Sequence, residues 1–300
     1  MIANEKKMRR VKIRAFAKIN LVLDVIGRRP DGYHEVEMIL QSIDLHDDLV
    51  FMPAPTVSLA VEGRQLPVDD RNIIIRAAKK LLADVGLAAG ARILLHKRIP
   101  VGAGLGGGSA DAAATLVGLN RLWGLGLSPT ELERIGATLG ADVPFCLRGG
   151  TVLATGIGEQ LADLPPLPPL PVFLAKPPFS VSTAQIYKNL SLSATDHHPA
   201  VKLVAALIRQ GDYRAIPRYW GNRLEEVTLK LYPELKTVMD WLVNMGLPVR
   251  MSGSGPTIFA FAPDWTPEHR RQVTIIMRRK GWWMYNGFLQ TSGLEVNEEA

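Results

Sequence analysis

The chain has 300 residues, 47% of them hydrophobic, which is enough apolar material to bury one large or two medium cores. Its net charge of +6 comes largely from basic residues at 6–10 and 270–280. These runs lack the interleaved aromatic residues of single-strand binders, so we expect solvated surfaces and no nucleic-acid partner. The single cysteine, Cys146, excludes an internal disulfide, and the charged start and the lack of a long apolar run predict a cytoplasmic protein without a membrane partner.

Strand and helix patterns follow one another through the first half of the chain. Val11–Ile26 alternates like a strand, and a turn follows at Arg28–Gly32. Further strands are expected at Glu37–Leu45 and Asp48–Met52, divided by a turn at His46 and Asp47, and at Val57–Val61 and Ala91–His96. Helices are expected over Ile73–Val85, over Ser109–Leu122, and from a cap at Ser128 to Gly140.

A proline-rich segment marks the clearest boundary in the chain. Leu164–Pro171 holds five prolines, which favour extended structure over a packed helix. Beyond it, helices are expected at Pro199–Arg209, Asn222–Leu231, Glu234–Asn244 and Pro267–Lys280, and strands at Val172–Lys176, Thr257–Phe261 and Gly281–Leu289. The sequence therefore predicts an α+β fold with two domains, residues 1–163 and 164–300.

Glycines crowd the segment between Pro100 and Asp111, at positions 102, 104, 106, 107 and 108. Glycine costs folding entropy, so five of them within seven positions need a physical reason. Without Cβ atoms, backbone N–H groups can approach an anion closely, and the following helix adds the positive end of its dipole. We expect a phosphate-binding loop, in which Ser109 caps the helix or turns its hydroxyl toward a phosphate or Mg²⁺. The alternative is a flexible surface loop.

Three other phosphate loops do not fit the spacing. No lysine follows the glycines, which excludes a Walker loop. Gly102–Gly107 matches G-x-G-x-x-G, but Lys97–Val101 separates it from the preceding strand and no acidic residue ends a second strand, which argues against a Rossmann site. The His-Arg-Asp and Asp-Phe-Gly strings of protein kinases are absent. A different type of phosphate loop remains.

Polar residues elsewhere are candidates for catalysis. Lys18 and Asn20 interrupt an apolar strand, and form either a site or a solvated outer face. Asp142 lies just past a helix end between apolar residues. It either caps a local turn or, held near a lysine, stays ionised and accepts the proton of an alcohol that attacks phosphorus. Ser252–Gly255 is a second glycine turn, which either closes over phosphates or is a plain hairpin turn.

Three motifs together resemble the GHMP kinase superfamily of small-molecule kinases. They are Ala17–Leu21, Pro100–Asp111 and Arg250–Pro256. The resemblance implies an ATP-dependent kinase that uses Mg²⁺. It also implies a two-domain α+β fold, with an N-terminal ribosomal-protein-S5-like domain and a C-terminal ferredoxin-like domain. Where the family usually has alanine after the second glycine of the third motif, this chain has Pro256, which removes one backbone donor.

Four strings narrow the resemblance to the branch that phosphorylates the 2-hydroxyl of cytidine-diphosphate-linked methylerythritol in non-mevalonate isoprenoid synthesis. They are Arg29–His34, Gly106–Asp111, Gly140–Phe145 and Lys176–Thr183. The branch implies Asp142 as base and Lys18 as its partner, and a substrate pocket of Asn20, Tyr33, His34, Thr183 and Tyr187, with Tyr187 stacked on the cytosine. It implies nucleotide contacts from Lys97, near the adenine, and from Pro100, Val101, Gly102, Ala103, Gly104, Leu105, Gly106, Gly107, Gly108, Ser109 and Ala110, with Ser109 also a candidate metal ligand.

Two alternatives stay open. One is a sister kinase that acts on mevalonate or homoserine. Tyr33 and His34 argue against it, because neither of these small substrates has a base that could stack on them. The other is a non-catalytic nucleotide sensor, which would need neither Lys18 nor Asp142. The sequence is compatible with a monomer or a homodimer.

Overall fold

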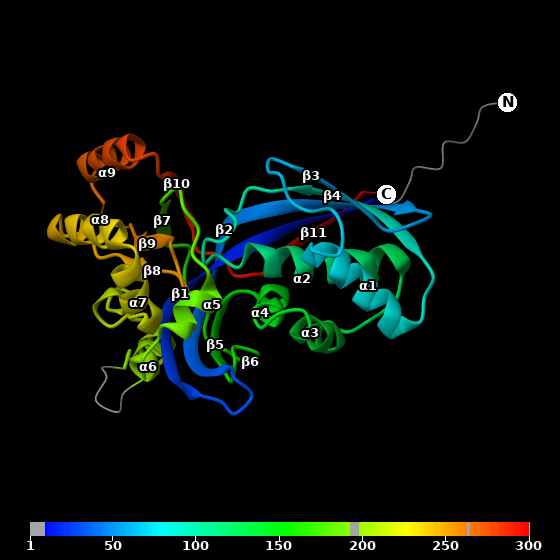
Figure 1. The fold of residues 1–300 in the computed structure, drawn as a ribbon, viewed down its shortest axis with the longest axis horizontal. Helices are drawn as coiled ribbons and strands as arrows, with labels where there is room; N and C mark the ends of the chain where they lie inside the picture. Colours follow the sequence, from blue (N-terminus) through cyan, green and yellow to red (C-terminus); the bar gives the residue numbers. More distant parts are fainter. Residues whose placement is uncertain (1–9, 193–197, 263–264, 300) are drawn as a thin grey trace.

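The computed structural model describes residues 10–192, 198–262 and 265–299, whose course Figure 1 follows. Residues 6–9 of the first basic run therefore lie outside the described part of the chain. The second run is exposed along α9 (Pro267–Arg279) and Lys280, as expected for a solvated surface. Within the described ranges, no helix combines the length and apolar character needed to cross a bilayer.

Seven of the described strands form the first sheet, in the order β11-β1-β2-β4-β3, with β5 paired to β2 and β6 to β5. They are β1 (Arg10–Arg28), β2 (His34–Ala54), β3 (Ser58–Glu62), β4 (Gly90–His96), β5 (Thr151–Thr155), β6 (Gln160–Asp163) and β11 (Leu294–Glu299). β3 runs parallel to β4, and the other pairs are antiparallel. The hairpin of β1 and β2 is the long element that connects both halves of the molecule (Figure 1).

The predicted turn at His46 and Asp47 is wrong, because β2 continues through both residues. Phe16 pairs with His46 while Ala17 pairs with Ile43, so the two residues between them form a bulge. A bulge re-aims the side chains that follow it and increases the local twist. Asp47 is consequently fully buried instead of exposed on a turn.

Four helices cover one face of the first sheet: α1 (Ile73–Val85), α2 (Gly107–Trp123), α3 (Pro129–Ala137) and α4 (Val143–Arg148). α2 is alanine-rich and lies directly on the strands, because a Cβ at Gly118 would come within 2.3 Å of the Phe51 ring. Ser128 caps α3 in a capping box with Glu131, as its sequence predicts. α3 ends before the expected Gly140, and the short α4 was not predicted.

The second sheet has the order β10-β7-β9-β8. Its strands are β7 (Pro171–Lys176), β8 (Arg250–Met251), β9 (Ile258–Phe261) and β10 (Trp283–Phe288). The helices of this half are α5 (Thr183–Lys188), α6 (Val201–Gln210), the 3₁₀ turn η1 (Ile216–Arg218), α7 (Arg223–Leu231), α8 (Pro233–Asn244) and α9. One core cluster joins the sheet to α8 and α9, and another joins it to α6 and to β1 and β2 of the first sheet.

The two halves are therefore packed against each other along the β1–β2 hairpin. After β10, the chain returns to the first sheet, where β11 pairs with β1. This return was not predicted, because Leu294–Glu299 is a short, acidic segment without a clear strand pattern. The domain limits at 163 and 164 stay a prediction, and the pairing of β11 places this last segment with the N-terminal sheet.

Candidate active site

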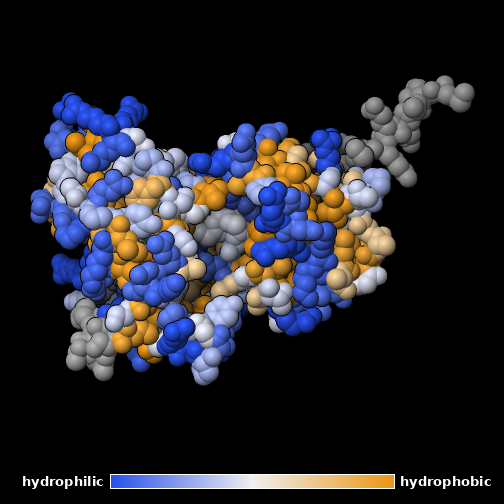
Figure 2. Space-filling view, in the orientation of Figure 1, coloured by the Kyte–Doolittle hydropathy of each residue, from blue (hydrophilic) through white to orange (hydrophobic). Residues whose placement is uncertain are grey.

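A cavity of about 1250 Å³ lies between the two halves, and Figure 2 shows the surface hollowed there. The predicted residues that line it are Lys18, Asn20, Tyr33, His34, Lys97, Pro100, Val101, Gly102, Ala103, Gly104, Leu105, Gly106, Gly107, Gly108, Ser109, Asp142, Thr183 and Tyr187. Ala110 does not line it, since its side chain is buried and its N–H donates to Gly106 O at 2.9 Å. The nucleotide contact expected at Ala110 is thus not supported.

The phosphate loop joins β4 to α2 and ends on a helix N-terminus. Gly104 and Gly106 have φ of +74° and +70°, in the left-handed region that favours glycine. Gly106 is also the N-cap of α2, so the helix starts at Gly107. No side chain caps this helix. The prediction that Ser109 caps the helix is wrong. Ser109 lies instead in the first turn of α2 and lines the cavity beside the free N–H groups that could bind phosphate.

Lys18 and Asp142 meet in the cavity. Lys18 Nζ lies 3.5 Å from Asp142 Oδ2 and donates to Asn20 Oδ1 at 2.8 Å. Lys18 and Asn20 are 5% and 2% exposed, so the solvated outer face considered for them does not exist. Asp142 makes no side-chain hydrogen bond to α4 although it precedes it, which argues against the capping role. The arrangement leaves a partly exposed carboxylate, oriented by a cation, next to the phosphate loop.

The second glycine turn packs on the first. Residues 252–257 connect β8 to β9, so the segment is a hairpin turn and also part of the cavity wall through Gly253 and Ser254. Ser252 Oγ donates to Gly104 O at 2.8 Å and accepts from the N–H of Asn20 at 3.3 Å. The peptide bond between Gly255 and Pro256 is cis. This turn therefore supports the conformation of the phosphate loop from the C-terminal half.

Aromatic residues form another part of the cavity wall. The rings of His34 and Tyr187 are 4.8 Å apart and inclined by 31°, although the two residues come from β2 and α5. Tyr33 is 61% exposed at the rim, and Thr183 Oγ1 is 2.8 Å from Ser254 Oγ. Burial, and secondarily the charge of Arg28, lowers the pKa of His34, which favours the neutral imidazole. Burial, then the charge of Asp142, raises the pKa of Tyr187 to about 12.

The side chain of Lys97 contacts two carboxylates, Asp47 and Asp111, for which the sequence predicted no function. Lys97 Nζ lies 2.6 Å from Asp47 Oδ2 and 2.5 Å from Asp111 Oδ2. The expected role of Lys97 near the adenine stays a prediction, since the two carboxylates hold its ammonium and its backbone N–H donates to Glu62 O at 3.0 Å. Asp111 is part of the glycine motif but received no role, and Asp47 was expected on a turn. Burial of Asp47 depends on the bulge in β2, for which the sequence carried no signal.

The site suits a magnesium nucleotide. In the described ranges, no group of three or more His, Cys, Asp or Glu residues could hold a metal ion. Mg²⁺ requires little from the protein, because in kinase sites it keeps waters and binds substrate phosphates. The hydroxyl of Ser109, beside the expected phosphate position, is an oxygen donor of the right kind.

Comparisons with known proteins agree with this geometry. Family models match at residues 72–150, described as GHMP kinases N terminal domain, and at residues 203–280, described as GHMP kinases C terminal. A curated relative from Pelotomaculum thermopropionicum, 4-diphosphocytidyl-2-C-methyl-D-erythritol kinase, is 51% identical over 268 residues, covering 88% of this chain and 93% of the relative. A second, from Geobacillus thermodenitrificans and of the same name, is 49% identical over 83% of this chain and 87% of the relative.

A solved structure extends the likeness to three dimensions. A crystal structure of 4-(cytidine 5'-diphospho)-2C-methyl-D-erythritol kinase has a TM-score of 0.76 and 37% identity, covering 93% of this chain and 98% of that one. It confirms the two-domain fold of mixed helices and strands predicted from the sequence. By the family models and by its curated relatives, the chain belongs to the GHMP kinase family.

Proposed function

We propose that this chain transfers the γ-phosphate of ATP to the 2-hydroxyl of 4-diphosphocytidyl-2-C-methyl-D-erythritol, an alcohol of non-mevalonate isoprenoid synthesis. The observation that carries the proposal is the ion pair between Lys18 Nζ and Asp142 Oδ2, at 3.5 Å and in one cavity with the phosphate loop. A pair of this kind is what an alcohol kinase needs beside its nucleotide. The curated relatives, which bear this substrate in their names, support the choice of alcohol.

The residues of the site divide the work of the reaction. The N–H groups of the loop and of the first turn of α2 bind the phosphates, where the helix dipole favours negative charge. Asp142 accepts the proton of the substrate hydroxyl while the hydroxyl oxygen attacks the γ-phosphorus. The bond from that phosphorus to the β–γ bridging oxygen breaks, which releases ADP. Lys18, held by Asn20, orients Asp142 and the hydroxyl. Bound Mg²⁺, with Ser109 as a protein ligand, would offset the charge of the β- and γ-phosphates.

The cytosine would occupy the aromatic end of the cavity. Tyr187 and a neutral His34 offer two adjacent ring faces there, and Tyr33 stands at the rim. Thr183 and Ser254 also line the cavity, and their hydroxyls, 2.8 Å apart, join α5, which carries Tyr187, to the second glycine turn; they would contact the diphosphate. A nucleotide-linked alcohol would thus span the cavity with its hydroxyl at Asp142. We expect the enzyme to work in the cytoplasm as a monomer or a homodimer.

Removal of the His34 ring tests the base pocket. We expect His34→Ala to raise the KM for the cytidyl alcohol by about 10-fold, because one stacked aromatic ring contributes about 1–3 kcal/mol per base. The KM for ATP should stay within about twofold, since the ring contact of His34 is with Tyr187 of α5 and not with a residue of the loop. Steady-state kinetics with each substrate varied in turn give both values. An unchanged KM for the alcohol would remove His34 from the cytosine pocket.

A substrate panel tests the proposed function itself. ADP release is measured with ATP and Mg²⁺, alone and with 4-diphosphocytidyl-2-C-methyl-D-erythritol, mevalonate or homoserine. We expect kcat/KM for the cytidyl alcohol to exceed the others by at least about 1000-fold, because a pocket built to bind a base is left unfilled by a small acid. Higher turnover of mevalonate or homoserine would indicate a sister kinase. ATP binding without ADP release from any alcohol would indicate a sensor.

A further inference from the structure

Three buried charged side chains lie beneath the phosphate loop, and the reaction described above uses none of them. Lys97 Nζ contacts Asp47 Oδ2 at 2.6 Å and Asp111 Oδ2 at 2.5 Å. The second oxygen of Asp47 accepts the backbone N–H groups of Arg98 at 2.6 Å and Ile99 at 2.9 Å. Lys97, Asp47 and Asp111 are 6%, 0% and 3% exposed, so water competes little with these contacts.

This cluster, the buried triad, is not an efficient means of stabilising a core. Removing charges from water costs free energy that their mutual attraction often fails to recover, and apolar residues of similar volume commonly stabilise as well or better. One oxygen of Asp111 has no hydrogen-bond partner in the described structure, which adds to the cost. Burial, partly offset by Lys97, raises the pKa of Asp111 well above its ordinary value. The contacts of the triad therefore need a reason other than the stability of the core.

The triad joins the two ends of the phosphate loop. Ile99 is the last residue before the loop begins at Pro100, and Asp111 lies in α2 just after the loop ends. The Lys97 ammonium sits between them, 3.1 Å from where a Cβ on Gly107 would stand. It thus lies against the first turn of α2, and Lys97 and Asp111 line the same cavity as that turn. Through Asp47, the same contacts anchor both ends to β2.

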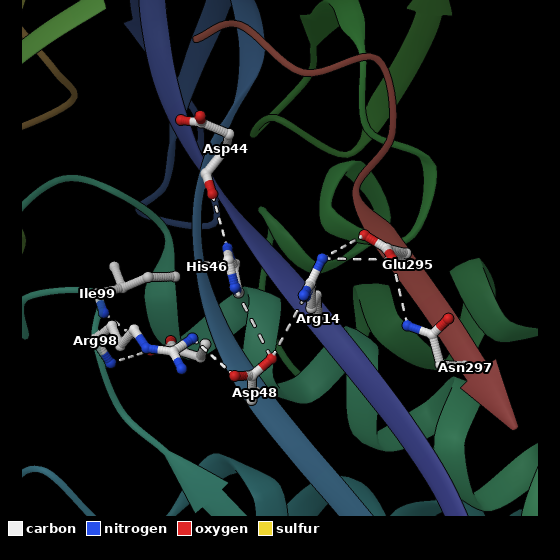
Figure 3. Close-up of polar contacts among 9 residues, drawn as sticks. Arg14, Asp44, His46, Asp48, Arg98, Ile99, Glu295 and Asn297 are labelled. Carbon is white, nitrogen blue, oxygen red and sulfur yellow. Dashed lines mark hydrogen bonds and ion pairs between the residues drawn. The ribbon is translucent and has the colours of Figure 1, made fainter. Parts of the chain in front are cut away.

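A second contact, on the opposite face of β2, holds the segment that precedes the phosphate loop (Figure 3). Arg98 reaches Asp48 at 2.7 Å, and Asp48 is also close to His46 and Arg14. The side chain of Arg98 is 52% exposed, and exposed pairs contribute little to stability. Consecutive aspartates of β2 therefore hold the chain before the loop from both faces, and the buried contact of Asp47 is the stronger one.

We propose that Asp47, Lys97 and Asp111 are positioning residues that hold the phosphate loop in its ATP-binding conformation before ATP arrives. Preorganised N–H groups bind an anion without the entropy cost of ordering the loop. The proposal rests on the proposed function only for the binding of ATP at this loop, and it does not depend on which alcohol is phosphorylated.

Two substitutions of Asp111 test this role, because both leave Lys97 paired with Asp47. Asp111→Leu cuts the link to α2 with a side chain of similar size, whereas Asp111→Asn keeps an oxygen that can accept from Lys97. We expect the Kd of a non-hydrolysable ATP analogue to rise by at least about 10-fold in Asp111→Leu and by about threefold in Asp111→Asn. The KM for the cytidyl alcohol should stay within about twofold in both, a split that a general structural defect would not produce.

Glu133→Leu is the matched control. Glu133 pairs with Arg148 at 2.8 Å and joins α3 to α4 over a similar separation in sequence, away from the loop. It should leave the Kd of the analogue unchanged. Urea unfolding of each variant shows whether the fold is intact, and if Asp111→Leu does not fold, Asp111→Asn decides. A wild-type Kd in the folded Asp111→Leu protein, or in Asp111→Asn when it alone folds, would overturn the proposal. A wild-type enzyme that binds the analogue but ignores the cytidyl alcohol would refute only the proposed substrate.

Discussion

Asp142→Asn should lower kcat by about 1000-fold, since general-base catalysis typically contributes about 10²–10⁴-fold to an enzymatic rate. Asparagine has nearly the same shape as aspartate but cannot take the proton of the attacking hydroxyl. Lys18 would keep its hydrogen bond to Asn20, and the start of α4 would be unaffected, because the Asp142 side chain makes no cap there. Steady-state kinetics and a direct measurement of ATP affinity give the two quantities to compare. The affinity for ATP should change by no more than about twofold.

Asp163→Asn provides the control for this substitution. Asp163 also pairs with a cation, Arg148 at 3.2 Å, but it is exposed and does not line the cavity. Its kcat should equal that of the wild type. A parallel loss of ATP affinity and turnover in Asp142→Asn would instead assign Asp142 to the structure of the cavity, and an active Asp142→Asn enzyme would remove it as the base.

The second large effect is expected at Gly104 in the phosphate loop. Its φ of +74° disfavours any other residue, and a Cβ there would come 2.1 Å from the carbonyl oxygen of Ser252. Because Ser252 belongs to the turn that supports the loop, the clash must displace one glycine turn from the other. We expect Gly104→Ala to lower kcat/KM for ATP by about 100-fold, the loss associated with a misplacement of about 1 Å at an active site. Kinetics with ATP varied at saturating alcohol measure it.

Gly86→Ala separates the clash from the backbone strain. Gly86 ends α1 with a φ of +64°, and a Cβ there would meet no atom within 4 Å. This substitution should reduce the free energy of unfolding by about 1 kcal/mol and leave ATP kinetics unchanged. Equal kinetic losses in both variants would mean that the loss in Gly104→Ala comes from lower overall stability and not from the clash with Ser252. Normal ATP kinetics in Gly104→Ala would show that the two glycine turns need not touch.

Local patterns in the sequence predicted most of the elements, because their signals are contained within the elements. The cap at Ser128 and the end of α1 at Val85 lie where the sequence predicts them. The failures depend on distant partners. The bulge opposite Phe16 exists because β1 and β2 pair over their whole length, and β11 becomes a strand because β1 offers it an open edge. The pairing of β2 or of β11 with β1 cannot be inferred from the sequence of β2 or of β11 alone.

The candidate site follows the same division. Motif chemistry predicted that Lys18, the phosphate loop and Asp142 matter, and the fold brings all three to one cavity. The structural partners of these residues were missed: Asp47 was expected on a turn, and Ser252 was assigned only to a glycine turn. Both act by supporting the loop from another part of the chain. A sequence pattern identifies the groups that touch a ligand more readily than the groups that hold them.

The position of the nucleotide tests the central claim most directly. A crystal structure with a non-hydrolysable ATP analogue, Mg²⁺ and the cytidyl alcohol would show the three groups together. We predict that the β- and γ-phosphates lie on the N–H groups between Gly102 and Ser109, with the 2-hydroxyl between the γ-phosphorus and the carboxylate of Asp142. A triphosphate bound elsewhere, or a hydroxyl out of reach of Asp142, would contradict this account.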